Sequence, residues 1–128
     1  MIAADMAALP AAISVLESLG AEAKGHAVFE ITDPADQQVL NIPEGISVTW
    51  LLHQHPDQQS NQQLNTIKRL SFPVGAPNIF VAGELSTIRE IKDYFMEQSL
   101  MNDHSYISSY WKIGAKDEEH KVAKRALA

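Results

Sequence analysis

The sequence contains no cysteine, and this absence removes several kinds of chemistry at once. Without thiols the chain forms no disulfides, no thiolate-ligated zinc or iron–sulfur clusters, and no cysteine nucleophile. It also lacks the Gly-x-Gly-x-x-Gly fingerprint, which is the usual turn around the phosphates of a dinucleotide. Any redox function must therefore rely on a bound cofactor, held without that fingerprint.

Positive charge and long apolar runs are also scarce. The 10 basic residues are outnumbered by 16 acidic ones, and the resulting formal charge of -6 does not attract phosphate backbones or anionic membranes. We therefore expect no nucleic-acid partner. No apolar run approaches the roughly 20 residues that span a bilayer, and the N-terminal segment lacks the basic start of a signal peptide. We expect no membrane insertion and a cytoplasmic location.

The 128 residues, 45% of them hydrophobic, fit one globular domain with a single core. Helical and strand periodicities alternate along the chain, which is typical of a parallel sheet covered by helices. The sequence predicts an α/β fold: a Rossmann-like, doubly wound, mainly parallel five-stranded sheet flanked by helices, with a C-terminal helix. The expected strands are 1–3, 26–31, 46–52, 78–82 and 105–110, and the expected helices are 8–19, about 64–69, a helix starting near 84–86, and the tail from 116.

Two stretches leave questions open. The expected first strand is only a stub, whereas an α/β unit normally opens with a full strand, so we expect the chain to be truncated at its front. The polar, glutamine-rich stretch 54–63 fits either a loop or the start of a helix.

Four segments resemble one known family in the same order. Residues 3–12, AADMAALPAA, resemble the Gly/Ala-Asp-x-Thr/Ala-Ala-Leu-Pro-Ala signature of the siderophore-interacting proteins, flavoprotein reductases related to the ferredoxin reductase superfamily. Further similar motifs are ISVTWLL at 46–52, VAGE at 81–84 followed by Ile-Arg at 88–89, and YISSYWKIG at 106–114. The resemblance covers nearly the whole chain, but only the C-terminal half of the family.

The resemblance implies the NAD(P)H-binding domain of a flavin-dependent ferric-siderophore reductase. In that family, hydride passes from NADH or NADPH to FAD, and single electrons then reduce the ferric siderophore and release Fe(II) for iron acquisition. The FAD lies on an N-terminal β-barrel that would precede Met1. The implied partners are therefore a ferric siderophore and the FAD-binding domain, and we expect the isolated chain to be colourless and inactive.

The resemblance also implies a set of cofactor contacts. The small residues Ala7 and Ala8 would let a pyrophosphate approach the first amides of a helix. Pro10 lies in the first turn of that helix, where its lack of an N–H costs no hydrogen bond. Gly83 would let the nicotinamide ring approach the backbone. The expected cofactor-binding residues are Ala4, Asp5, Met6, Ala7, Ala8, Leu9, Pro10, Gln54, Ala82, Gly83, Glu84, Tyr110 and Trp111.

Some of these residues also fit a purely structural role. Tyr110 and Trp111 are expected to stack near the flavin, but they equally fit core or lid aromatics. Glu84 equally fits an acid at a helix start, where the helix dipole favours it. The basic tail is expected to dock an anionic siderophore, or else to form an ordinary solvated helix end. Its expected substrate-binding residues are Lys121, Lys124 and Arg125.

Basic residues are missing where a 2′-phosphate would bind. Related reductases place arginine or lysine just after the third strand, but neither occurs between residues 24 and 68, and Gln54 stands where the resemblance places an arginine. Glu30 and Asp33 add negative charge near the expected adenosine ribose. We predict that NADH is preferred over NADPH, unless a basic side chain of residues 68–69 folds back toward the pocket.

Two rival functions remain. His53, His55 and Asp57 have the HxHxD spacing of binuclear metallohydrolases, although Gln58 replaces the histidine that follows in that family. The same segment also fits a surface loop. A non-catalytic binding module is the other alternative, because half of a flavoprotein reductase has no flavin of its own.

Overall fold

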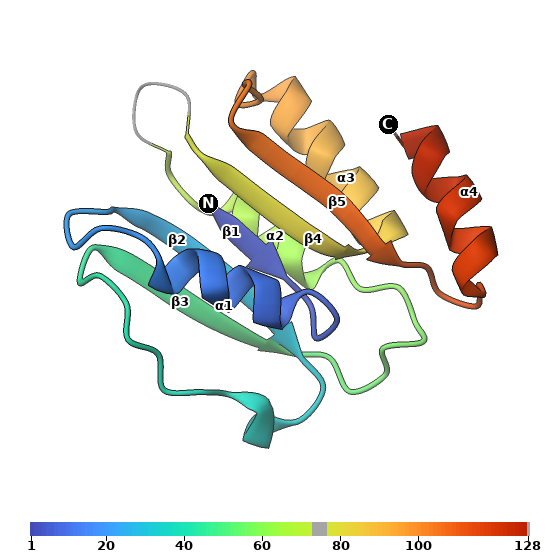
Figure 1. Ribbon diagram of the computed structural model, residues 1–128, viewed down its shortest axis with the longest axis horizontal. Coiled ribbons are helices and arrows are strands. Elements are labelled where there is room, and N and C mark those ends of the chain that lie inside the picture. Colours follow the sequence, from blue (N-terminus) through green and yellow to red (C-terminus); the bar gives the residue numbers. More distant parts are fainter. Residues whose placement is uncertain (73–76, 128) are drawn as a thin grey trace.

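The computed structural model describes residues 1–72 and 77–127, without the side chains of residues 117 and 118. Within these residues the strands form one five-stranded sheet in the order β3-β2-β1-β4-β5 (Figure 1). Every neighbouring pair is parallel, so the predicted α/β fold is confirmed, and its sheet is wholly rather than mainly parallel. The strands are β1 (Ile2–Ala4), β2 (Gly25–Ile31), β3 (Ile46–Leu52), β4 (Ile79–Glu84) and β5 (Ser105–Trp111).

Helices cover both faces of the sheet, as a doubly wound fold requires. One face carries α1, and the opposite face carries α2 and α3, while α4 lies beside β5 and α3 (Figure 1). None of the helices among the described residues is long and apolar enough to cross a bilayer. The helices are α1 (Leu9–Glu17), α2 (Gln62–Lys68), α3 (Leu85–Glu97) and α4 (Asp117–Leu127).

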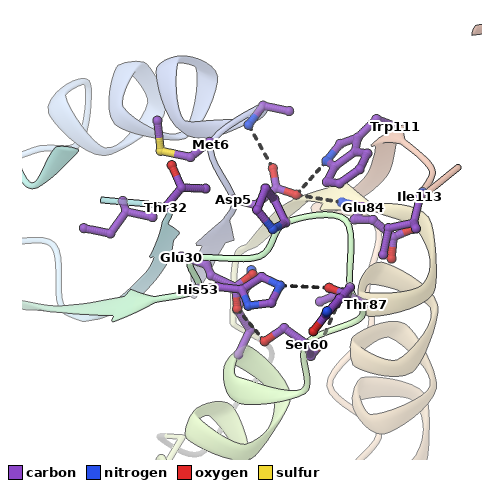
Figure 2. A pocket seen from close by; sticks show the side chains of 15 residues that line it. Asp5, Met6, Glu30, Thr32, His53, Ser60, Glu84, Thr87, Trp111 and Ile113 are labelled. Carbon is purple, nitrogen blue, oxygen red and sulfur yellow. Dashed lines mark hydrogen bonds between the residues drawn. The ribbon is translucent and has the colours of Figure 1, made fainter. Parts of the chain in front are cut away.

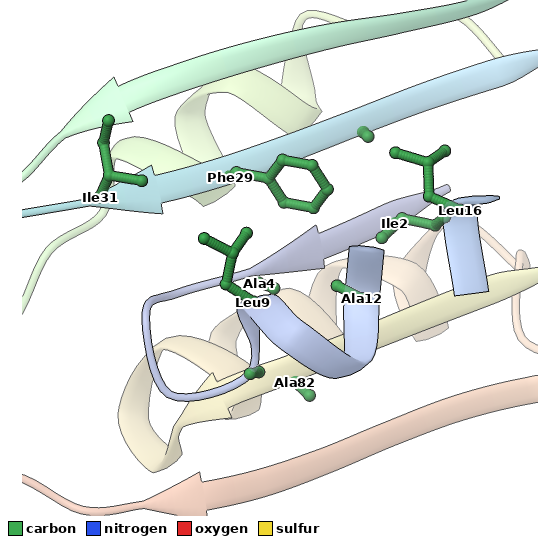
Figure 3. Packing of buried hydrophobic residues seen from close by; sticks show 10 residues of the cluster. Ile2, Ala4, Leu9, Ala12, Leu16, Phe29, Ile31 and Ala82 are labelled. Carbon is green, nitrogen blue, oxygen red and sulfur yellow. The ribbon is translucent and has the colours of Figure 1, made fainter. Parts of the chain in front are cut away.

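The sheet separates two apolar cores because successive strand residues point to opposite faces. On one side, Leu9, Ala12 and Leu16 recur at helical spacing along α1 and pack on Phe29 and its neighbours in the sheet (Figure 3). The other core packs the apolar stripe of α3 and Ile67 of α2 against the opposite face. Its α3 and sheet members are Ile88, Ile91, Phe95, Ala3, Val28, Ile79 and Val81.

The short strand β1 lies at the centre of the sheet and is buried along its whole length. Its three residues pair with β2 on one side and β4 on the other. A central parallel strand is covered on both faces, so both of its sides are apolar. The small residues Ala3 and Ala4 meet this requirement in β1. The glutamine-rich stretch is resolved as a loop as far as residue 61, and helix α2 begins at Gln62.

Because all strands are parallel, their carboxyl ends lie along one edge of the sheet. Strand β4 extends two residues beyond the expected 78–82 and ends at Glu84, which is also the N-cap of α3. The Glu84 carboxylate accepts hydrogen bonds from the Ser86 amide at 3.1 and 3.2 Å. Glu84 is therefore an acid at a helix start, one of the two roles that the sequence left open for it.

Candidate functional site

A cavity of about 210 Å³ opens at the carboxyl edge of the sheet, where open α/β folds bind their ligands (Figure 2). Drug-sized ligands generally occupy cavities of about 300–1,000 Å³, so this volume is enough for a single ring or sugar but not for a whole dinucleotide. Segments that follow every strand contribute to its wall. The lining residues are Asp5, Met6, Ala7, Glu30, Ile31, Thr32, His53, Pro56, Gln58, Ser60, Gln63, Glu84, Thr87, Trp111 and Ile113.

A larger cavity, of about 750 Å³, lies at the opposite edge of the sheet. Its wall includes Gly25, Ile46 and Phe80, and none of the buried polar or charged residues among the described part of the chain lines it. The smaller cavity is lined by the buried side chains of Asp5, Glu30 and several other polar residues. Buried polar groups that converge on a cavity are the usual mark of a binding site, so we place the site at the carboxyl edge.

Asp5 holds one end of this cavity together. Its Oδ1 accepts from the amides of Ala7 and Ala8 at 3.0 and 3.3 Å, at the start of α1. Its Oδ2 accepts from the Glu84 amide and from Trp111 Nε1, each at 2.9 Å (Figure 2). Burial raises the pKa of Asp5, and these hydrogen bonds oppose the rise. One carboxylate thus joins the carboxyl ends of β1, β4 and β5.

Gly83 makes this arrangement possible. Its φ is +154°, and a Cβ at this position would lie 2.7 Å from Asp5 Oδ2. The pairing of β4 with β5 shifts here, because Gly83 pairs with Ser109 and Glu84 with Trp111, which leaves Tyr110 as an extra residue. The glycine expected to admit a nicotinamide ring therefore makes room for the Asp5 carboxylate.

The other end of the cavity is built around Glu30, which is 7% exposed. Ser60 Oγ donates to Glu30 Oε2 at 2.8 Å, and Thr87 Oγ1 donates to the Ser60 carbonyl at 3.2 Å (Figure 2). Burial raises the pKa of Glu30, opposed by the Ser60 hydrogen bond and the nearby His53. The His53 ring donates through Nε2 to the Gln58 carbonyl at 2.8 Å, since a carbonyl can only accept.

Gln63 completes this end. Its side chain is 2% exposed and lines the cavity. Within the described residues, its buried Oε1 has no hydrogen-bond partner. Leaving a buried acceptor unpaired costs about 1–3 kcal/mol, so such an atom calls for an explanation.

The predicted cofactor residues divide into those that line the cavity and those that do not. Asp5, Met6, Ala7, Glu84 and Trp111 line the cavity. The remaining expected residues do not line it, for different physical reasons. Ala4, Ala8, Leu9 and Ala82 are buried in the core, Pro10 is exposed in the first turn of α1, Gln54 is exposed on its loop, and Tyr110 packs on the α1 side of the sheet.

Ala7 and Ala8 were expected to let a pyrophosphate approach the first amides of the helix, and that expectation stays a prediction. Both amides already donate to the Asp5 carboxylate, an anion supplied by the chain itself. A second anion at the same donors would meet like charge. These two amides are therefore not free to bind a phosphate while Asp5 accepts from them.

Sequence reasoning missed the polar residues Ser60, Gln63 and Thr87 of the cavity wall. The chain is rich in glutamine between residues 54 and 63, and nothing in the pattern marks one of them as buried. Thr87 falls on the buried side of α3, where a hydroxyl needs a partner and finds the Ser60 carbonyl. A polar residue on an apolar helix face was the one available signal.

The residues of the rival metal site and of the basic patch are not brought together at the cavity. His53 lines the cavity, whereas His55 and Asp57 are exposed on the loop. In the part of the chain that the structure describes, no group of three or more histidine, aspartate or glutamate side chains is placed to hold a metal ion. The expected substrate-binding residues Lys121, Lys124 and Arg125 are exposed on α4, and none of them lines the cavity.

The parallel order β3-β2-β1-β4-β5 with a cavity at the carboxyl edge defines a Rossmann-like domain. The family model for siderophore-interacting proteins matches residues 1–114, and the chain belongs to that family. This confirms the family to which the four sequence motifs pointed.

Relatives and solved structures agree with this assignment. The chain is 30% identical over 123 residues to the ferric vibriobactin reductase ViuB of Vibrio cholerae, which covers 94% of this chain and 45% of that protein. A siderophore utilization protein from T. fusca superposes with a TM-score of 0.83 at 30% identity, over 94% of this chain and 47% of the other. The siderophore-interacting protein SipS from Aeromonas hydrophila, at 21% identity and a TM-score of 0.82, shares the fold over 98% of this chain and 50% of the other. The chain thus spans about half the length of the proteins it matches.

Proposed function

We propose that this chain is the NAD(P)H-binding domain of a ferric-siderophore reductase whose FAD is held outside these 128 residues. The observation that carries the proposal is the polar cavity at the carboxyl edge of a Rossmann-like sheet, in a chain of the siderophore-interacting family. The relative named as a ferric vibriobactin reductase supports the reductase part of the proposal.

The cavity fits the ring or sugar part of a nicotinamide coenzyme. Met6, Trp111 and Ile113 offer apolar surface, and Glu30 offers a hydrogen-bond acceptor. A bound coenzyme would supply a hydride, and a flavin would pass its two electrons singly to ferric ions, so the domain's own residues would hold and orient the reacting ring. The Asp5 network fixes Trp111 for that task, because the indole N–H is hydrogen-bonded to a buried carboxylate.

NADH fits this site better than NADPH. In the described part of the chain, no lysine or arginine lines the cavity, and the nearest residues after β3 are His53, Pro56 and Gln58. Lys68 does not fold back toward the site, because its Nζ lies 5.8 Å from the centre of the Tyr94 ring. For the adenosine ribose to occupy this cavity, the reacting ring must lie outside it, and in that pose a 2′-phosphate would find no guanidinium or ammonium partner in the cavity wall.

The basic side chains of α4 are proposed to dock an anionic ferric siderophore. Lys124 Nζ lies 6.0 Å from the centre of the Tyr110 ring, so the patch lies next to the end of β5. In an enzyme that also holds the flavin, replacing the patch with neutral residues should raise KM for an anionic siderophore. Oxidation of NADH by small flavin acceptors should stay unchanged. Equal siderophore kinetics would reject the docking role for Lys121, Lys124 and Arg125.

Calorimetric titration of the 128-residue chain with NADH and NADPH tests the main proposal. We expect saturable binding of NADH, weaker binding of NADPH, and a colourless purified protein. A stoichiometric flavin absorption band would contradict the placement of FAD outside this chain. Absence of binding by both coenzymes would contradict the coenzyme role itself.

A further inference from the structure

The C-terminal helix α4 is largely exposed, yet it carries one buried polar side chain. Among the α4 side chains that the structure describes, only His120 is buried, at 9% exposed. A buried polar group needs a hydrogen-bond partner, because it has lost its interactions with water. The partner is Ser109 of β5, which is 0% exposed, and 2.8 Å separates His120 Nε2 from Ser109 Oγ. This buried pair therefore ties α4 to β5.

The Ser109 hydroxyl also reaches the backbone of its own strand. Its Oγ lies 3.1 Å from the carbonyl oxygen of Trp111. A carbonyl can only accept, so the hydroxyl donates its single hydrogen to Trp111. Ser109 Oγ then has only lone pairs left for His120, and the Nε2 atom of the ring must carry the hydrogen. Two hydrogen bonds thus act in series, from His120 to Ser109 and from Ser109 to Trp111.

These hydrogen bonds meet the bulge beside the cavity. Ser109 and Trp111 flank Tyr110, the extra residue of the β4–β5 register shift. A hydroxyl that bridges the two flanking residues fixes the bulge, and bulges beside sites re-aim the neighbouring side chain. Here that side chain is Trp111, which lines the cavity and donates through its indole to Asp5 Oδ2 at 2.9 Å (Figure 2). Trp111 is therefore held at its indole by Asp5 and at its carbonyl by Ser109.

The other attachment of α4 does not lead to the cavity. Near the end of the helix, Lys92 Nζ of α3 donates to the Leu127 carbonyl at 3.2 Å, and the Leu127 side chain packs against the α3 side of the sheet. The contact of His120 is the one that continues to the cavity wall. The whole of α4 lies beyond residues 1–114, which match the family model, so that model does not include this contact.

We propose that His120 is a positioning residue for the cavity: through Ser109 it fixes the β5 bulge and so keeps the Trp111 indole in the cavity wall. His120 does not itself line the cavity. The consequence for a ligand rests on the proposed function, in which Trp111 helps to orient the reacting ring. The consequence for the indole does not, and the free chain is sufficient to measure it.

The experiment follows the indole N–H of Trp111 by ¹⁵N NMR in the 128-residue chain. The sequence has two tryptophans, and Trp50→Phe assigns their two indole signals. In Ser109→Ala and His120→Leu we expect the Trp111 indole hydrogen to exchange with water roughly fivefold faster, the effect of losing one net hydrogen bond. His120→Gln keeps an N–H donor at similar reach and should restore the slow exchange. His104→Leu, the same change at an exposed histidine, is the matched control and should leave the rate unchanged.

Backbone amides of α4 distinguish positioning from simple attachment of the helix. If His120 only anchors α4, His120→Leu will speed up hydrogen exchange in the helix and leave the Trp111 indole unchanged, which would overturn the proposal. An unchanged indole in Ser109→Ala would overturn it as well, and this variant decides the question if His120→Leu does not fold. The ring itself gives a further test, because ¹⁵N NMR shows which nitrogen carries the hydrogen. A His120 ring protonated at Nδ1 alone would overturn the series of hydrogen bonds.

Titration with NADH separates this proposal from the proposed function. Ser109→Ala and His120→Leu should raise the Kd of NADH by up to about fivefold, because a loosened indole must be ordered again before the ring binds. His120→Gln should restore the Kd, and His104→Leu should not change it. Faster indole exchange with an unchanged Kd would leave the coenzyme role intact and overturn the positioning role in binding. An indole that depends on His120 in a chain that binds no NADH would overturn the coenzyme role and support the positioning of Trp111.

Discussion

Two buried carboxylates, Asp5 and Glu30, face the same cavity from neighbouring strands, yet their surroundings differ. Asp5 accepts from the Ala7, Ala8 and Glu84 amides and from the Trp111 indole. Glu30 has one side-chain donor among the described residues, Ser60 Oγ (Figure 2). Gln63, whose buried Oε1 is unpaired, lines the same cavity.

The difference separates architecture from binding within one site. A buried anion surrounded by protein donors is a structural element, because its donors would be orphaned if it were lost. A buried anion with spare acceptor capacity is available to a ligand. We therefore interpret the Asp5 end as the part that fixes the cavity's shape and the Glu30 end as the part that is available to a ligand.

The largest effect is expected from Asp5→Ala, which leaves the buried Glu84 amide and the part-buried Ala7 amide and Trp111 indole without an acceptor. We expect the free energy of unfolding to fall by about 3 kcal/mol or more, since each unpaired buried donor costs about 1–3 kcal/mol. Urea unfolding at neutral pH measures the change. Asp57→Ala, on the exposed loop after β3, is the control and should stay within about 0.5 kcal/mol. A loss below 1 kcal/mol for Asp5→Ala would mean that Asp5 is not the structural tie inferred above.

Gly83→Ala tests the same tie from its other side. The new Cβ would lie 2.7 Å from Asp5 Oδ2, and the backbone φ of +154° is unfavourable for alanine. Strain of this kind costs about 1–3 kcal/mol, so we expect a loss of about 2 kcal/mol. In an Asp5→Ala background the steric clash disappears, and the loss should shrink. Equal losses in both backgrounds would show that the glycine serves the backbone alone.

The sequence predicted the fold well because periodicity and parallel topology depend on many residues at once. The alternation of strands with the helices that became α1 and α3 was legible from residues such as Leu16, Phe29 and Phe95. Sequence alone did not reveal that Asp5 occupies the amides at the start of α1. That fact depends on the β4–β5 register shift, which brings Trp111 and the Glu84 amide to the carboxylate.

Strand alternation explains part of the difference between the predicted residues and the cavity wall. The motif was treated as a continuous contact surface, whereas alternate residues of a strand face opposite sides of the sheet. Ala4 and Ala82 therefore point into the α1 core rather than the cavity, and Tyr110 is the extra residue of the bulge. Gln63 was hidden among similar glutamines, because burial of one of them is decided by how α2 docks on the sheet.

The pH dependence of stability sharpens the contrast at the Glu30 end. Because burial raises the pKa of Glu30 above its unfolded value, the folded chain binds more protons than the unfolded chain just above pH 4. This contribution to stability is fully present below the unfolded pKa and is lost as the pH rises through the folded pKa. Glu30→Gln removes it, so the variant should gain stability relative to the unmodified chain on going from pH 4 to pH 7.

Urea unfolding at a series of pH values measures this difference. Glu17→Gln, at an exposed position of α1, is the control for removal of a negative charge. Asp5 contributes with the same sign, since burial also raises its pKa, so the trend should diminish in Glu30→Gln without vanishing. A Glu30→Gln variant that loses stability relative to the unmodified chain as the pH rises would contradict the assigned direction.

The smallest effect concerns coenzyme choice, where sequence and structure favour different positions. The motif comparison places the missing arginine at Gln54, but Gln54 is exposed away from the cavity, while Gln58 lines it beside His53. An arginine at residue 58 would bring a guanidinium to the Glu30 end, where it can pair with a 2′-phosphate and offset the local negative charge.

Gln58→Arg should therefore shift the ratio of Kd values toward NADPH by about 1 kcal/mol, the lower range for a charge-assisted hydrogen bond at a partly exposed site. Gln54→Arg should shift it less, because its side chain starts outside the cavity wall. Calorimetric titration with both coenzymes compares the two variants. A larger shift for Gln54→Arg would show that the ribose is recognised at the position expected from the sequence.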